Sequence, residues 1–347
     1  AIYAFSHMYE VFIKIDPSLD SVTILDDYDA GGFWGSGMIA TNGMIYVLPS
    51  CRRSVLRLDP RSDHVHTFGQ LTSACGWRFG ALANNGAIYG IPGGFADAVL
   101  KIDTLSNTVT TFSTVELKDK SQMGEWGYPI IANGAIYAMP YKATAVLKID
   151  PASDNVSFLG HLSGGWVEGV LSQAGAIYSV PLRGTEVLKI DSLSDNVTTF
   201  GYSEITRERP AIAREIAWNW ATCVASMSGD LYGIPFGSAT VMKIIPALDS
   251  ISFISFEGSN KGKNFWDTAV LAENGMIYAA QSHPTFEPKV LKIDPFVDRA
   301  VILEAVGVSG LFVGWIYLTV TSNGIIYGVP SQTVSRFEDR EIVVVLK

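Results

Sequence analysis

The chain has 347 residues, of which 48% are hydrophobic and only 17% are charged, below the about 25% usual for globular domains. Its net charge is −9, and no lysine- or arginine-rich run stands out, so a nucleic-acid partner is not expected. The apolar runs are far shorter than the roughly 20 residues that a membrane helix requires, which predicts no membrane span. Because residue 1 already lies inside a repeat, we expect no signal peptide, and the cell compartment stays unknown.

One strand-and-turn unit recurs along the chain. It is clearest at 85–112 (NGAIYGIPGGFADAVLKIDTLSNTVTTF), 133–160 (NGAIYAMPYKATAVLKIDPASDNVSFLG) and 174–201 (AGAIYSVPLRGTEVLKIDSLSDNVTTFG). A tight turn marks each unit, with successive turns 41 to 54 residues apart, at Gly43, Gly86, Gly134, Gly175, Gly229, Gly275 and Gly324. A period in the forties is the size of one four-stranded propeller blade.

Each unit divides into four short strands, A to D. Strand A follows a tryptophan and ends in a two-residue Asn-Gly turn, which needs positive φ at both central residues. Strand B is IY-x-(I/V/M)-P, and its proline cannot donate to the next strand. Strand C is VLKID, and strand D is NVTTF, rich in β-branched residues. The alternating Lys148 and Asp150 of strand C are interpreted as polarity of the blade edge, with cross-strand pairs.

The pattern predicts an all-β single domain over residues 1–347, a closed β-propeller of four-stranded antiparallel blades. Strands B and C each occur eight times, the last strand C near Arg336, but strand A with its tryptophan occurs seven times. Residues 33–347 then hold seven complete repeats, and 1–32 hold a partial blade. We slightly favour eight blades, the missing strand A coming from outside this chain or from a rearranged C-terminus. Seven blades plus an N-terminal segment is the alternative.

The G-x-I-(Y/W) strand followed by V-L-K-I-D-P resembles the propeller repeats of virginiamycin B lyase and its relatives, which read roughly G-x-I-W-F-T-E and then I-G-R-I-D-P. The resemblance covers nearly the whole chain and implies the propeller architecture. Those lyases use a metal beside a histidine and acidic residues, whereas here Y-x-I-P replaces W-F-T-E and no histidine recurs. The resemblance therefore transfers the fold and no catalytic residue.

The connections D–A and B–C vary in length between units, while A–B and C–D turns are uniform. In a propeller the D–A and B–C connections emerge on one face, and length variation on one face of a repeat protein marks its binding face. We call this the loop face. Its long D–A connections are Ser113–Glu125, Gly201–Ala217 and Glu257–Phe265, and its unusual B–C connection is Ser282–Pro288. The mixed charges of Gly201–Ala217 fit either a short helix that offers a partner surface or an ordinary solvated loop.

All eight tryptophans lie where a D–A connection enters strand A. Seven of them, one per unit, are predicted to ring a central channel and stack a ligand: Trp34, Trp77, Trp126, Trp166, Trp220, Trp266 and Trp315. The favoured alternative is a packing tryptophan wedged between neighbouring blades, because a large residue repeated in every unit is usually structural.

The neighbours of these tryptophans differ from unit to unit, so they are the candidates for specificity. The predicted ligand-binding residues among them are Arg78, Tyr128, Glu168, Asp267 and Tyr317. Glu168 is expected to share the strand face of Trp166, and Asp267 to face away from Trp266. The favoured alternative for the charged ones is a solvated side chain at the channel rim.

The sequence indicates no metal site and no cofactor. His64 and His66 are expected to face solvent on a strand D, while His7, His161 and His283 fall in loops of distant units. The odd, sparse set Cys51, Cys75 and Cys223 is interpreted as free thiols, buried or half-buried.

Three functions remain open. The first is a non-catalytic propeller that binds a small molecule, a glycan or a protein partner through the loop face. The second is a lyase or hydrolase acting at the channel mouth with acids such as Glu168 and Asp267. The third is a structural subunit of a larger assembly. A group of carboxyls with perturbed pKa values at the mouth would favour the enzyme.

Overall fold

The computed structural model describes residues 1–5, 12–19, 21–25, 33–72, 75–113, 124–208, 218–258, 265–282, 289–304, 315–321, 324–330 and 344–346. The chain divides into two compact units, Ala1–Ser163 and Gly164–Lys347, called the first and second unit here. Single-domain organisation over 1–347 stays a prediction.

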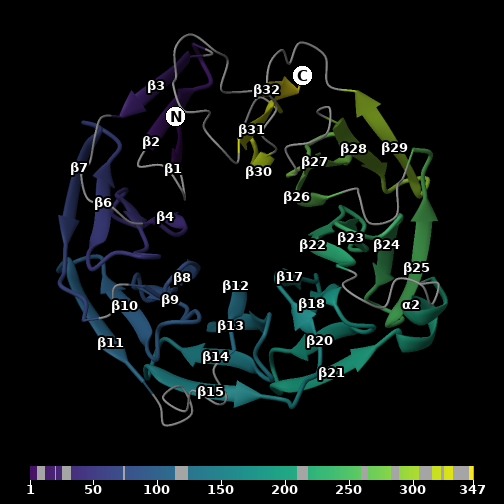
Figure 1. The fold of residues 1–347 in the computed structure, drawn as a ribbon, viewed down its shortest axis with the longest axis horizontal. Helices are drawn as coiled ribbons and strands as arrows, with labels where there is room; N and C mark the ends of the chain where they lie inside the picture. Colours follow the sequence, from purple (N-terminus) through teal and green to yellow (C-terminus); the bar gives the residue numbers. More distant parts are fainter. Residues whose placement is uncertain are drawn as a thin grey trace. The chain divides into compact units, whose positions relative to one another are not determined.

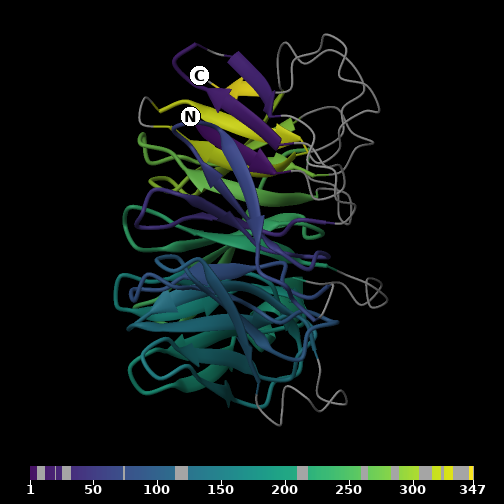
Figure 2. The ribbon, with the colours of Figure 1, turned by 90° about the vertical axis from the view of Figure 1, so that its left-hand side faces the viewer.

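The first unit consists of antiparallel sheets whose strands follow chain order (Figure 1). A three-stranded N-terminal sheet, β1 to β3, precedes three four-stranded sheets, β4 to β7, β8 to β11 and β12 to β15. The strands are β1 (Ile2–Phe5), β2 (Phe12–Asp16), β3 (Ser21–Leu25), β4 (Gly37–Ile39), β5 (Ile45–Val47), β6 (Val55–Asp59), β7 (His64–Phe68), β8 (Gly80–Leu82), β9 (Ile88–Gly90), β10 (Val99–Asp103), β11 (Thr108–Phe112), β12 (Trp126–Ala132), β13 (Ala135–Pro140), β14 (Val146–Asp150) and β15 (Asn155–Leu159). These sheets are twisted rather than flat, as Figure 2 shows from the side.

The second unit repeats this pattern and adds one short helix. The elements are β16 (Gly165–Trp166), β17 (Val170–Leu171), β18 (Ala176–Ser179), β19 (Pro181–Arg183), β20 (Val187–Asp191), β21 (Asn196–Phe200), α2 (Tyr202–Glu208), β22 (Trp220–Ala225), β23 (Leu231–Pro235), β24 (Thr240–Ile245), β25 (Ser250–Ser255), β26 (Trp266–Leu271), β27 (Ile277–Gln281), β28 (Lys289–Asp294), β29 (Arg299–Glu304), β30 (Trp315–Val320), β31 (Ile326–Pro330) and β32 (Val344–Leu346). Helix α2 confirms the helix expected in the connection that follows β21.

The structure has seven blades, which corrects the slight preference for eight. Seven sheets begin with a strand that contains or follows a tryptophan, three in the first unit and four in the second. We call this first strand of each blade the inner strand. The N-terminal sheet has none, so it is the extra segment of the alternative prediction. None of the described sheets is closed on itself, and closure of the propeller stays a prediction.

The last blade differs from the expected repeat. The strand that pairs with β31 is β32, with Tyr327 opposite Val345, rather than a strand at Arg336. Arg336 itself lies outside the described residues. Within the part of the chain that the structure describes, this blade has three strands, whereas the other six blades have four.

The turns between the first two strands follow two designs. At Asn133–Gly134 both residues have positive φ, 47° and 78°, as the two-residue hairpin predicts. At Gly43 only the glycine does, and the Gly43 amide donates to the Ala40 carbonyl while the Ala40 amide donates to the Met44 carbonyl. This is a three-residue loop that ends in a left-handed glycine, so the expectation of two positive φ angles is wrong there.

The hydrophobic core lies between adjacent blades. The third strand reads VLKID in several blades. Its valine, leucine and isoleucine are buried, and its lysine and aspartate are half-buried. One cluster joins Tyr46 of β5 and Leu48, which follows β5, to Trp77, Ile88 and Leu100 of the next blade. Because each sheet buries both faces against its neighbours, the repeated apolar residues are explained by packing.

A polar contact between neighbouring sheets recurs within each unit, and we call it the inter-blade clasp. The Tyr89 hydroxyl donates to Asp154 Oδ1 (2.7 Å), and Lys101 Nζ lies 2.6 Å from Asp154 Oδ2. Tyr232 and Lys243 bind Asp298 in the same way, at 2.8 and 2.7 Å. Each of these lysines also lies opposite a tyrosine of the neighbouring strand, as Lys101 does opposite Tyr89 with its Nζ 5.6 Å from the ring centroid, so the expected pairing across strands is confirmed and an ion pair with the following blade is added to it.

The aspartates of the clasp occupy a special backbone conformation. Asp154 and Asp298 have φ of 56° and 51°, in the left-handed region that Asp and Asn tolerate better than most residues. In one clasp the turn residue is Asn107, with φ of 53°, and it accepts from Tyr46 (2.9 Å). This clasp has an amide in place of the carboxylate.

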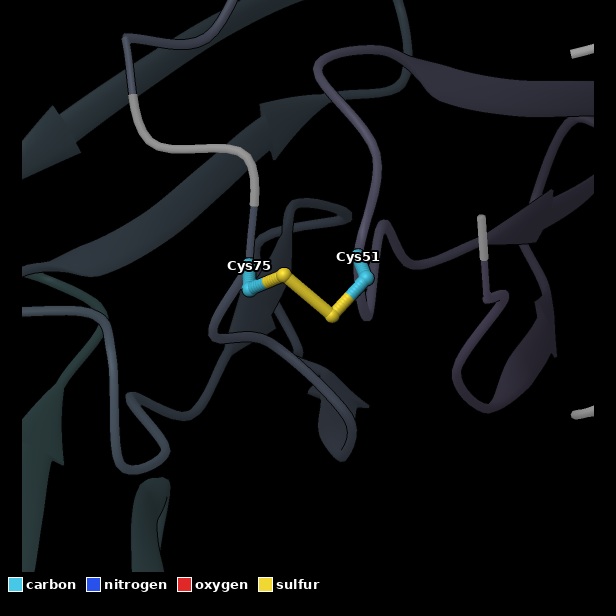
Figure 3. Close-up of a disulfide and its surroundings, with 2 residues drawn as sticks. All are labelled: Cys51 and Cys75. Carbon is cyan, nitrogen blue, oxygen red and sulfur yellow. A yellow bond between two sulfur atoms is a disulfide. The ribbon is translucent and has the colours of Figure 1, made fainter. Parts of the chain in front are cut away.

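Cys51 and Cys75 form a disulfide, which corrects their interpretation as free thiols (Figure 3). Cys51 lies in the connection after β5, and Cys75 lies in the connection that enters the next blade; their Cα atoms are 3.8 Å apart. Backbone bonds bring the two connections together, since the Gly76 amide donates to the Ser50 carbonyl (2.9 Å). Counting cysteines cannot reveal this contact between blades. Cys223 is free and buried, as expected.

Candidate functional site

The repeated tryptophans are packed into their blades. Six of them are almost fully buried, with exposed fractions of 0 to 6%: Trp34, Trp77, Trp126, Trp166, Trp220 and Trp266. Four donate their indole N–H to a carbonyl at the start of the third strand of their own blade, as Trp77 does to Ala98 (2.8 Å) and Trp220 to Thr240 (2.8 Å). The indole therefore ties the inner strand to the third strand.

This packing explains why the tryptophan recurs in every blade. It agrees with the alternative interpretation, a structural side chain, and leaves almost no indole surface for a ligand. The stacking role of these six residues stays a prediction, and the side chains of Trp315 and Tyr317 lie outside the described residues. Trp218, the eighth tryptophan, is half-buried and packs on Phe236 with ring centroids 5.0 Å apart.

The inner strands carry a bulge beside the tryptophan. Pairing shifts by a residue between Trp126 and Pro129, between Trp220 and Cys223, and between Trp266 and Thr268. A bulge re-aims the side chains next to it, so the strict alternation used to place Glu168 and Asp267 does not hold. The faces to which these two carboxyls belong stay a prediction, and the charge of Glu168 contributes to the raised pKa of Asp267.

The position two residues after the tryptophan brings successive blades into contact. The inner strands themselves contact one another within each unit, as β8 does with β12 and β22 with β26. In the first unit this position holds Phe79 and Tyr128, whose ring centroids are 4.0 Å apart with planes tilted by 39°. The exposed Arg78 lies over Phe79, with its guanidinium carbon 5.2 Å from the ring centroid.

In three blades of the second unit the same position holds a polar residue, Glu168, Thr222 or Thr268, whereas in the last blade it holds Tyr317. The Thr222 hydroxyl donates to Glu168 Oε2, which joins the inner strands of two blades. In the next pair of blades, the Leu318 amide donates to Thr268 Oγ1 (3.1 Å). Ser179 donates to the Glu168 backbone carbonyl (2.5 Å) and holds the chain at this point.

Glu168 and Asp267 are half-buried, and we call them the carboxyl pair. Burial raises the pKa of Glu168, and the hydrogen bond from Thr222 opposes that rise. Burial raises the pKa of Asp267 to about 7, opposed by a hydrogen bond with Ser282, while the charge of Glu168 raises it further. Asp267 Oδ1 is buried and has no hydrogen-bond partner among the described residues. Both side chains are half-buried, and their role as rim charges stays the alternative prediction.

The carboxyl pair is not balanced by a cation in the part of the chain that the structure describes, since no described ion pair includes Glu168 or Asp267. Cys223, next to Thr222, has its pKa raised by burial and by the charge of Glu168, so its thiol is protonated. The pair can accept hydrogen bonds from a ligand, and Asp267 can also exchange a proton near neutral pH.

Other predicted positions lie apart from this pair. His64 and His66 are exposed on β7, as expected, and His161 is exposed after β15. His7 and His283 lie outside the described residues, as do most of the long connections of the loop face. The described parts of those connections lie together within a blade, since the Ser282 amide donates to the Phe265 carbonyl (2.9 Å). No group of three described His, Cys, Asp or Glu side chains is arranged for a metal ion.

Exposed apolar side chains recur at the turns between third and fourth strands. They are Leu19, Leu105, Leu193, Leu248 and Phe296, each 69 to 83% exposed. They lie away from the inner strands, at the turns that contribute to the inter-blade clasp. Their role in a larger assembly stays a prediction.

Sequence reasoning missed Phe79 and Thr222. Both stand two residues after a tryptophan, as Tyr128 and Glu168 do, so comparing that one position across the units would have found them. The chemistry of single residues drew attention to the charges instead. The same comparison separates neighbouring blades with two aromatic rings, Phe79 and Tyr128 in the first unit, from neighbouring blades with Glu168 and Thr222 in the second.

Comparisons with known proteins define the class. No protein-family model and no curated protein matches the chain. Solved structures do: a streptogramin B lyase (11% identity, TM-score 0.61, 86% of this chain and 90% of that chain) and virginiamycin B lyase from Staphylococcus aureus (8%, 0.62, 86% and 92%). The extracellular domain of a putative hybrid two-component system from B. thetaiotaomicron also matches (14%, 0.59, 86% and 39%).

These likenesses show the fold alone. The protein is an all-β propeller with the architecture of the virginiamycin B lyase-like propellers, which confirms the resemblance seen in the repeats. No described helix has the length and apolar character needed to cross a membrane.

Proposed function

We propose that this protein is a ligand-binding β-propeller and that the inner strands of its second unit bind a small polar molecule at the carboxyl pair. The observation that carries the proposal is the partial burial of Glu168 and Asp267, at positions that do not repeat, with Asp267 Oδ1 itself buried and unpartnered among the described residues. Burying a carboxyl costs free energy unless a partner compensates it. The repeat does not explain this cost, because the other blades do not carry a carboxyl at these positions.

The chemistry of the pair selects the kind of ligand. The buried, unpartnered Asp267 Oδ1 is a hydrogen-bond acceptor, so the ligand presents hydroxyl or ammonium groups, as glycans and amines do. A small molecule or glycan reaches half-buried groups more readily than a flat protein surface does, so these two are proposed ahead of a protein partner.

A binding screen tests this proposal. The purified chain is titrated with neutral glycans and small amines, and binding is measured by calorimetry. We expect Glu168→Gln and Asp267→Asn each to weaken the bound compound roughly tenfold or more, since hydrogen bonds to charged groups contribute about 1.5–3 kcal/mol. The exposed Glu273→Gln is the matched control and retains the affinity. Equal affinity in all three variants excludes the carboxyl pair as the site.

A second candidate function is a lyase or hydrolase at the same place. Asp267 supports it, because a carboxyl with a pKa of about 7 is suited to proton transfer near neutral pH. Incubating the protein with the same compounds and analysing products by mass spectrometry tests this candidate. An enzyme shows turnover with a pH inflection near 7 that Asp267→Asn removes, whereas a binding protein returns every compound unchanged.

A further inference from the structure

The inner strands of the first unit carry a second surface with different chemistry, formed by Arg78, Phe79 and Tyr128. The two rings contact each other closely, with 4.0 Å between centroids, and both are half-buried, so each keeps an accessible part. A pair of rings fixed in this way provides a rigid apolar platform at low cost in conformational entropy.

The backbone beneath this platform is fixed. The Arg78 carbonyl accepts from the Ser36 amide (2.8 Å), and the Phe79 carbonyl accepts from the Ile91 amide (2.8 Å). Gly35 packs against the Arg78 carbonyl so closely that a Cβ on Gly35 would lie 2.5 Å from the carbonyl oxygen. The side chains of Arg78 and Phe79 therefore project from a position that the neighbouring strands hold.

The charge of Arg78 is not neutralised within the described chain. No described carboxylate forms an ion pair with its exposed guanidinium, which lies 5.2 Å from the Phe79 centroid. The acidic residue nearest in sequence to Tyr128 is Glu125, and it pairs with Lys142 (2.8 Å). An arginine beside an aromatic platform is the arrangement that recognises a carboxylate attached to a ring.

We infer that Arg78, Phe79 and Tyr128 form a binding site for a small molecule that carries a carboxylate on a ring, the ring lying on the two aromatic side chains and the carboxylate pairing with Arg78. Sugar acids and aromatic acids share this chemistry. The site does not depend on the proposed function, because it uses other residues and a ligand of opposite charge.

Matched pairs of compounds test the inference. The full chain is titrated with glucuronate and benzoate, and with their neutral counterparts glucose and benzyl alcohol, with binding followed by calorimetry. We expect one of the two acids to bind roughly tenfold or more tightly than its neutral counterpart, a ratio that corresponds to about 1.4 kcal/mol. Which acid binds distinguishes a sugar ligand from an aromatic one.

Three variants separate charge from stacking. Arg78→Ala abolishes the preference for the acid, whereas Arg53→Ala, at another exposed arginine of the same unit, leaves it unchanged. Tyr128→Leu keeps apolar volume but removes a ring, so it weakens acid and neutral compound alike. The inference is overturned if neither acid binds at millimolar concentration or if Arg78→Ala retains the preference. Loss of binding in Glu168→Gln alone would instead assign the ligand to the carboxyl pair.

Discussion

The two units share a frame and differ in the residues it displays. In both, a buried tryptophan ties the inner strand to the third strand, and a clasp of tyrosine, lysine and aspartate joins neighbouring blades. Two residues after the tryptophan, the first unit presents the rings of Phe79 and Tyr128, and the second presents Glu168 and Thr222. The repeated residues thus explain the fold, and the unrepeated ones are where binding chemistry is to be sought.

The largest effect is expected at the shared frame. Trp77→Ala and Trp220→Ala each remove a buried indole and leave a carbonyl without its donor, so each lowers the free energy of unfolding by about 3–5 kcal/mol. Urea unfolding measures both, and the half-buried Trp218→Ala serves as a control with a smaller loss. Unequal losses at Trp77 and Trp220 would break the comparison, because the two units would not share one frame.

The next effect separates the units. The folded state favours the protonated Asp267 carboxyl, so the wild type loses stability as the pH rises from about 4, where the unfolded group titrates, to about 7. A pKa raised from 3.8 to about 7 corresponds to roughly 4 kcal/mol at most. Asp267→Asn removes this contribution and leaves that of Glu168, whose pKa burial also raises. Unfolding midpoints between pH 4 and pH 8 measure it, with Glu273→Gln as control, and an unchanged dependence in Asp267→Asn contradicts the assignment.

The smallest effect concerns the clasp. Asp154→Asn in the first unit and Asp298→Asn in the second turn an ionic clasp into the neutral form already present at Asn107. Each costs about 0.5–1.5 kcal/mol, because the tyrosine bond remains and the ion pair is partly exposed. Thermal melts at low and high salt measure it, and salt reduces the difference. Losses that differ between the two units would show that the clasps are not equivalent.

The fold was largely predictable, because every blade packs in the same way and therefore needs the same kinds of residue at the same positions. The period of the turns, the VLKID strand and the single tryptophan per unit all predicted four-stranded blades. The blade count was less certain because strand B and strand C motifs outnumber the tryptophans, and the excess motifs belong to an N-terminal sheet without an inner strand.

The candidate site was only partly predictable. Arg78, Glu168 and Asp267 were identified by charge, but their surroundings depend on bulges that break the alternation of a strand. The disulfide of Cys51 and Cys75 and the lysine of the clasp depend on contacts between one blade and the next. Such contacts join positions that no local pattern connects, so one sequence does not reveal them.

The clasp also determines how such a chain can lengthen or shorten. Tyr89 and its aspartate are 65 residues apart, and Tyr232 and its aspartate 66, whereas the turns recur every 41 to 54 residues. Each clasp therefore spans more than one repeat, so successive clasps overlap along the sequence. An insertion or deletion preserves every clasp only if it adds or removes whole repeats, whichever residues form its ends. A fragment of any other length leaves a tyrosine without its acceptor.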